Sequence, residues 1–207
     1  TTNGTLLSKG LLDVWSNFKK VSVGCSIDSI YERDEYIRFP TKFKNVERNL
    51  HILDNTPDNI QVSITVAVQI LNVKHIPEFI KWKVNSKFKK LNFEVKSGIQ
   101  TGGGLIDSHL LYSPNYLSIQ CLPEQDKQHV HELFDDLKSW LWDNYTQDEN
   151  FWHINPYGWK RWEGLLTHMD NEDQSELLPA LSEYMNKLDI LRNTYAEETF
   201  PELAHLF

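Results

Sequence analysis

The chain has 207 residues, of which 40% are hydrophobic and 24% are charged, an ordinary globular composition in a chain long enough to bury a core. The formal net charge of −8 argues against sequence-independent nucleic-acid binding, because such binding needs lysine and arginine to displace counterions from phosphates. Two cysteines exclude a disulfide framework, and also any metal site built from cysteines alone.

The N-terminal region carries no sign of export or membrane insertion. No apolar run in the sequence approaches the roughly 20 residues of a membrane span, and no signal-peptide pattern opens the chain. We therefore expect a cytoplasmic protein without a membrane partner. The chain opens on Thr1-Thr2-Asn3-Gly4-Thr5, which is typical of the end of a strand and its turn. Since no strand precedes this turn, we interpret the chain as the C-terminal part of a longer protein.

Three segments alternate apolar and polar residues with the period of two that a half-buried strand requires. They span residues 21–28, 60–69 and 91–96. The faces of the first carry Val21, Val23, Cys25 and Ile27 on one side, and Ser22, Gly24, Ser26 and Asp28 on the other. The polar faces of the second and third carry Gln61, Ser63, Thr65, Ala67 and Gln69, and Asn92, Glu94 and Lys96. One face of each strand is suited to a core, while the other lines something polar.

Helical patterns separate these strands at 42–53 and 76–84, and the spacing of apolar residues predicts an outer helix over 5–19. The alternation of strands and helices implies right-handed parallel crossovers. An open doubly wound sheet more often has strands that are apolar on both faces, whereas in a barrel the polar face lines the lumen. We therefore predict an α/β fold, a partial (β/α) barrel of parallel strands that encloses a wet cavity.

The rest of the chain is predicted to be mainly helical. A charged loop or short helix occupies 30–40, beyond the carboxyl end of the first strand, where parallel barrels carry their chemistry. Residues 101–104 form a glycine-rich break, and residues 116–120 resemble a last short strand. Helices are expected over 123–145, 158–169 and 173–197. This division places the barrel in 1–121 and a helical extension in 122–207.

The strand ends resemble motifs of radical S-adenosylmethionine enzymes, and within them the phage and marine-bacterial proteins of the twitch-domain subgroup. The resembling segments are Thr2-Asn3-Gly4-Thr5, Ser26-Ile27-Asp28-Ser29, Glu35-Tyr36-Ile37-Arg38, Val46-Glu47-Arg48-Asn49-Leu50 and Ala67-Val68-Gln69-Ile70-Leu71-Asn72. Similar segments near the C-terminus are Leu117-Ser118-Ile119-Gln120-Cys121-Leu122-Pro123, Leu188-Asp189-Ile190-Leu191-Arg192 and Phe200-Pro201-Glu202-Leu203. The resemblance implies the second half of that family's barrel, followed by its C-terminal helices.

In this family S-adenosylmethionine and a 4Fe–4S cluster generate a 5′-deoxyadenosyl radical, which abstracts hydrogen from a small-molecule or peptide substrate. The resemblance assigns the cofactor to Ser26, Arg38, Asp28 and Asn72, and the substrate to Thr2, Asn3, Thr65 and Gln69. The cluster motif C-x3-C-x2-C and the family's Gly-Gly-Glu are absent from this chain. Cluster ligation requires thiolates, so this chain alone is expected to be catalytically inactive.

Most of the assigned residues also have a plain structural interpretation. Ser26 can bond nearby backbone, Arg38 can pair with Glu35 or Asp34, and Asp28 can cap the next helical turn. Asn72 can likewise cap a helix, Thr2 and Asn3 can form a plain turn, and Glu94 and Lys96 can form an internal ion pair. His129 and His131 lie two residues apart on a predicted helix and make a poor metal pair. Helical packing explains most of Trp140, Trp142, Trp152, Trp159 and Trp162.

Two other functions are compatible with the sequence. One is a non-catalytic α/β module that binds a ligand or partner, and the other is a hydrolytic barrel that uses Asp28 and Glu94 as paired carboxylates. Because the first strands of a barrel are missing, we also expect an open sheet edge that lowers stability or promotes self-association.

Overall fold

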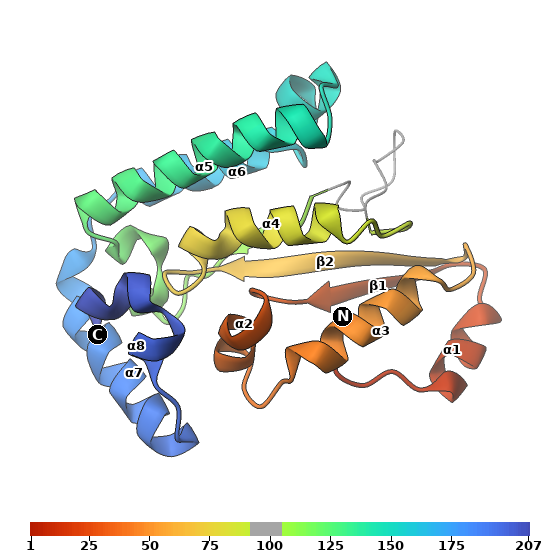
Figure 1. Ribbon diagram of the computed structural model, residues 1–207, viewed down its shortest axis with the longest axis horizontal. Helices are drawn as coiled ribbons and strands as arrows, with labels where there is room; N and C mark the ends of the chain where they lie inside the picture. The colour runs from red at the N-terminus through yellow and green to blue at the C-terminus, as the bar shows by residue number, and fades with distance from the viewer. Residues whose placement is uncertain (92–104) are drawn as a thin grey trace. The chain divides into compact units, whose positions relative to one another are not determined.

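The structure is a computed structural model that describes residues 1–91 and 105–207, and it divides into two compact units (Figure 1). Unit 1 comprises residues 1–67 and 78–109, and unit 2 comprises residues 68–77 and 110–207. These units reflect compactness rather than independent folding, so the expected boundary near residue 121 stays a prediction.

A three-stranded sheet of order β1-β2-β3 is formed by β1 (Val21–Ser26), β2 (Ile60–Val68) and β3 (Asp107–Leu110). β1 and β2 are parallel over their paired length. On the other edge of β1, Thr2 forms a parallel bridge opposite Cys25. The elements therefore lie side by side in their chain order. This confirms an α/β fold, while closure toward a barrel stays a prediction.

Burial confirms the predicted two-faced pattern for the first two strands. In β2 the apolar residues are buried and the residues between them are half-buried. In β1, Val23 and Cys25 are buried, and Ser26 remains half-buried. Helix α3 (Phe43–Asp54) buries its own apolar side chains, including Val46, Leu50 and Leu53. The core of unit 1 therefore forms where the apolar face of the strands meets buried helix residues.

Helix positions largely follow the sequence pattern. The predicted segments 42–53, 76–84, 123–145 and 158–169 are the helices α3, α4 (Ile76–Asn85), α5 (Glu124–Asn144) and α6 (Trp159–Asp170). The short helix α2 (Tyr31–Ile37) follows β1, and α1 (Lys9–Ser16) precedes it. α1 is shorter than expected, because Ser8 Oγ accepts a hydrogen bond from the Leu11 amide and starts the helix there.

The last predicted helix is divided in two. α7 (Leu178–Arg192) ends where Asn193 takes a left-handed backbone with φ of 53°, and α8 (Ala196–Thr199) follows. Asparagine tolerates this conformation, which terminates helices. None of the helices in the described ranges is long and apolar enough to cross a bilayer.

The predicted strand over 116–120 was wrong. Two 3₁₀ turns stand there, η2 (Asn115–Leu117) and η3 (Ile119–Cys121), and Ser118 starts the second by accepting a hydrogen bond from the Gln120 amide. Serine caps compete locally with strand pairing, so an alternating pattern can fold as turns. The third strand is β3 instead. Of the predicted strand 91–96, all residues after Leu91 lie outside the described ranges, as does the break at 101–104.

Unit 2 contains a buried ion pair between the turn η1 (Val73–His75) and α5. Lys74 Nζ lies 2.5 Å from Asp126 Oδ1, and these side chains are only 5% and 8% exposed. His205 Nε2 lies 2.9 Å from the other oxygen of Asp126. Together, Lys74, Asp126 and His205 connect three parts of unit 2 that are distant in sequence.

We expect Asp126→Asn to lower the free energy of unfolding by about 3 kcal/mol, because it leaves the Lys74 ammonium buried without its counter-ion. Urea denaturation measures this loss. The double variant Lys74→Met/Asp126→Leu should be more stable than the single one, since it removes both charges. Glu183→Gln, which breaks an exposed pair with Lys187, is the control and should change little. Equal effects of Asp126→Asn and Glu183→Gln would contradict the expectation.

Candidate functional site

Small polar side chains line one face of the β1–β2 pair. Paired residues of parallel strands point to the same side, and the register sets Gly24 beside Ser63 and Ser26 beside Thr65. Ser26 Oγ lies 3.4 Å from Thr65 Oγ1. Both residues are half-buried, so their hydroxyl groups remain within reach of a ligand. The structure thus joins one predicted cofactor residue to one predicted substrate residue.

Asp28 follows directly at the carboxyl end of β1 and is almost completely buried. Its Oδ1 accepts a hydrogen bond of 2.8 Å from the Ala67 amide of β2. Its Oδ2 lies 2.9 Å from Arg38 Nε, at the end of α2. One carboxylate therefore holds β1, β2 and α2 together, a larger role than the helical cap considered from sequence.

The buried side chain of Asp34 binds the backbone of the loop between β1 and α2. Its Oδ1 accepts hydrogen bonds from the amides of Asp28, at 2.9 Å, and Ser29, at 3.3 Å, and lies 4.0 Å from Arg38 Nε. Burial raises the pKa of Asp34 to about 6, although the amides and Arg38 act in the opposite direction. Sequence reasoning considered Asp34 only as a partner for Arg38. Its spacing of four residues from Arg38 on α2 was the available signal.

Arg38 is the cation of this edge, and its side chain is 22% exposed. Both of its recorded pairings, with Asp28 and Asp34, use Nε. The terminal guanidinium nitrogens therefore keep donor capacity within the described part of unit 1. Ser29 Oγ and Asp34 Oδ2 are buried there without a hydrogen-bond partner. The edge thus combines a partly buried cation, two hydroxyl groups and buried polar atoms without hydrogen-bond partners.

The other predicted site residues lie elsewhere. Thr2 stands opposite Cys25, which places it on the apolar face of the sheet, and its Oγ1 accepts a hydrogen bond from the Gly4 amide. Asn3 is exposed and accepts hydrogen bonds from Thr5, so it forms the plain turn considered from sequence.

Gln69 and Asn72 belong to unit 2, where both are buried. Asn72 Oδ1 accepts a hydrogen bond of 2.9 Å from the Gln69 amide, which closes the turn after β2. Glu94 and Lys96 lie outside the described residues. The site that the structure assembles is therefore the carboxyl edge of β1 and β2, with Ser26, Asp28, Arg38 and Thr65, which we call the β1–β2 edge.

Neither cysteine is suited to bind a metal. Cys25 is completely buried on the apolar strand face, and burial raises the pKa of its thiol to about 11. Burial also raises the pKa of Cys121 to about 11, and its thiol donates a hydrogen bond to the Asn115 carbonyl. Within residues 1–91 and 105–207, no group of three or more histidine, cysteine, aspartate or glutamate residues could hold a metal ion.

The histidine and tryptophan residues have ordinary surroundings. His129 lies 3.5 Å from Glu132, and His131 lies 2.9 Å from Asp170. Packing explains the buried residues Trp152, Trp159 and Trp162, whereas Trp140 is half-buried and Trp142 is exposed.

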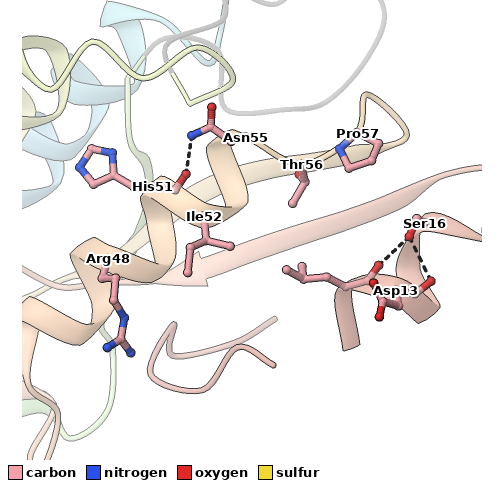
Figure 2. Close-up of a pocket in the computed structure, with 9 residues that line it drawn as sticks. Asp13, Ser16, Arg48, His51, Ile52, Asn55, Thr56 and Pro57 are labelled. Carbon is pink, nitrogen blue, oxygen red and sulfur yellow. Dashed lines mark hydrogen bonds between the residues drawn. The ribbon is translucent and has the colours of Figure 1, made fainter. Parts of the chain in front are cut away.

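A pocket of about 730 Å³ separates α1 from α3, and none of the predicted site residues lines it (Figure 2). Two of its polar side chains bond to nearby backbone. Asn55 Nδ2 donates to the His51 carbonyl, and Ser16 Oγ donates to the Asp13 carbonyl (Figure 2). These bonds leave the pocket without a converging set of polar groups, and we assign no function to it.

The fold and the β1–β2 edge were compared with known proteins. No protein family, curated protein or solved structure matches this chain. The function therefore has to be argued from the geometry of the edge itself.

The raised pKa of Asp34 predicts that stability falls as pH rises from about 4 to about 6. In that window the folded protein holds a proton that the unfolded chain has lost, so the free energy of unfolding decreases by up to about 3 kcal/mol. Asp34→Asn keeps an oxygen for both amides and stays neutral, so it should flatten this decline. Urea denaturation across the window measures it, with exposed Asp135→Asn as control. Parallel pH profiles for Asp34→Asn and the unmodified chain would refute the expectation.

The buried thiols give a second prediction. At pH 7 to 8 we expect Ellman's reagent to label neither Cys25 nor Cys121 in the folded protein, because thiolates are the reactive species. Both thiols should react within the mixing time after unfolding in guanidinium chloride. Cys25→Ser identifies which thiol reacts at each stage. Rapid labelling of either thiol in the native chain would show that it is accessible and ionised.

Proposed function

We propose that this chain supplies the S-adenosylmethionine-binding half of a radical S-adenosylmethionine barrel, with the cofactor at the β1–β2 edge. The observation that carries the proposal is the pair of adjacent hydroxyls of Ser26, at the carboxyl end of β1, and Thr65 of β2, followed two residues after Ser26 by Asp28, which pairs with the partly buried Arg38. The order of Thr2, β1, β2 and β3 is also the neighbour order that a barrel requires.

The residues of the edge fit the amino-acid end of this cofactor. The terminal nitrogens of Arg38 suit a carboxylate, because the guanidinium presents its donors as a planar fork. Ser26 and Thr65 offer hydroxyl groups that can donate or accept. Asp28 positions Arg38 through Nε and so reduces the conformational freedom of the fork. In a complete enzyme the cofactor supplies hydrogen-abstracting chemistry, and this chain binds and orients it.

The cluster does not fit the described residues. A 4Fe–4S cluster needs thiolate ligands, and both cysteines of this chain are buried with raised pKa values. We therefore place the cluster ligands outside this chain and assign no electron-transfer step to its residues. The peptide substrate suggested by the family resemblance remains part of the same proposal.

A binding module without chemistry is the second candidate. It is favoured by the ion pairs of Arg38 with Asp28 and Asp34, which give this arginine a role in the fold itself. The hydrolytic alternative is weakened, because both oxygens of Asp28 already have partners and a general base needs a free one. Its second carboxylate, Glu94, lies outside the described residues.

Calorimetric titration of the chain with S-adenosylmethionine and with 5′-methylthioadenosine tests the proposal. The second compound lacks the amino-acid carboxylate. Arg38→Lys keeps a cation beside Asp28 but removes the fork, so we expect about tenfold weaker binding of S-adenosylmethionine and unchanged binding of 5′-methylthioadenosine. Ser26→Ala should weaken binding about fivefold through one lost hydrogen bond.

Arg48→Lys is the matched control, because Arg48 is exposed on α3 and lies outside the β1–β2 edge. It should bind both compounds as the unmodified chain does. Failure of S-adenosylmethionine to bind, or an equal effect of Arg38→Lys on the two compounds, would overturn the cofactor assignment.

A further inference from the structure

Unit 2 contains a groove where α7 ends and α8 begins, which we call the α7–α8 groove. It has a volume of about 460 Å³, and its lining includes Met185, Asp189, Ile190, Tyr195, Glu197 and Glu198. The left-handed turn at Asn193 separates the two helices and so opens the groove between them. All of its residues belong to unit 2.

Large apolar side chains are left in water at this groove. Of the lining residues, Ile190 is 82% exposed and Tyr195 is 60% exposed, and Leu191, which follows Ile190 outside the lining, is 81% exposed. The only fully buried residues of α7 are Leu181 and Met185. Adjacent exposed apolar residues of this size are unfavourable on an isolated surface and mark sites of interaction. The exposed apolar side chains at the end of α7 are therefore suited to pack against a binding partner.

The charge of the groove indicates what covers it. Its lining contains three carboxylates, Asp189, Glu197 and Glu198, and no lysine or arginine. Asp189 is committed to the fold, because it accepts hydrogen bonds from Thr194 Oγ1 and from the Ala196 amide. Glu197 and Glu198 are exposed. An approaching partner therefore meets negative charge beside apolar side chains.

We propose that the α7–α8 groove docks a cationic, amphipathic polypeptide segment of another protein. An apolar side chain of the partner packs against Ile190 and Tyr195, and its lysine or arginine side chains face Glu197 and Glu198. Nucleic acid is repelled by these carboxylates. A symmetric contact between two copies of the chain would bring the same acidic residues together, so charge also disfavours self-association here.

Fluorescence anisotropy with dye-labelled peptides tests this partner. The probe is a short peptide in which lysine pairs flank leucine and phenylalanine. We expect saturable binding that weakens about tenfold when NaCl rises from about 50 to about 500 mM, because salt screens exposed charges. A peptide with glutamate in place of lysine, and one with serine in place of leucine and phenylalanine, should not bind.

Variants of the groove separate its two contributions. Glu197→Gln/Glu198→Gln should weaken binding about tenfold and lower its salt dependence. Ile190→Ser should weaken binding while leaving the salt dependence intact. The matched control is Asp135→Asn/Asp136→Asn, which removes two adjacent exposed carboxylates from α5 and should bind like the unmodified chain. Circular dichroism confirms that each variant is folded.

Binding that is equally affected by both double variants would show that only net charge matters, and would overturn the groove as the site. Absence of binding to the lysine peptide would overturn it as well. Concentration-dependent dimerisation that Ile190→Ser abolishes would identify a second copy as the occupant and replace this proposal. None of these outcomes depends on whether the chain binds S-adenosylmethionine.

Discussion

The carboxylate of Asp28 is the interaction on which the carboxyl edge of the sheet depends. It binds the Ala67 amide and Arg38 Nε, while the Asp28 amide is itself held by Asp34. Parallel strands bring their carboxyl ends to one edge, but sequence alone does not fix the loops that follow. Here one buried side chain fixes them. The polar face of the strands, with Ser26 at its end, is consequently presented beside a cation.

Sequence periodicity predicts those parts of this fold that are set by burial. Alternation along β1 and β2 follows from one apolar face, and the spacing of α3 follows from its buried stripe, so both could be found without coordinates. Residues around Ser118 alternate too, yet a local serine cap makes turns of them. The role of Asp34 in holding the loop after β1 was not predicted, because its hydrogen bonds are to backbone amides, which have no sequence signature.

The predicted site residues on strands were located more accurately than those in turns. Ser26 and Thr65 lie on one face because the two-residue period assigns both to the polar side, and the pairing of β1 with β2 sets them opposite each other. Thr2 does not join them, since one residue of register decides which face a side chain takes. Asn72 binds the Gln69 amide and closes a turn in unit 2. Its distance along the chain from β2 did not indicate this role. Pattern locates a strand face well, and it locates a turn residue poorly.

Arg38 appears at first to be unavailable, because Asp28 already neutralises it. Displacing Asp28 would leave a carboxylate that is 5% exposed without its counter-ion, which costs several kcal/mol in a protein interior. A ligand carboxylate therefore has to bind the terminal nitrogens while Nε stays on Asp28. The two interactions are compatible, since the ion pair with Asp28 is made on the side of Nε and a ligand would bind the two terminal nitrogens. The ion pair then orients the arginine for a ligand instead of competing with it.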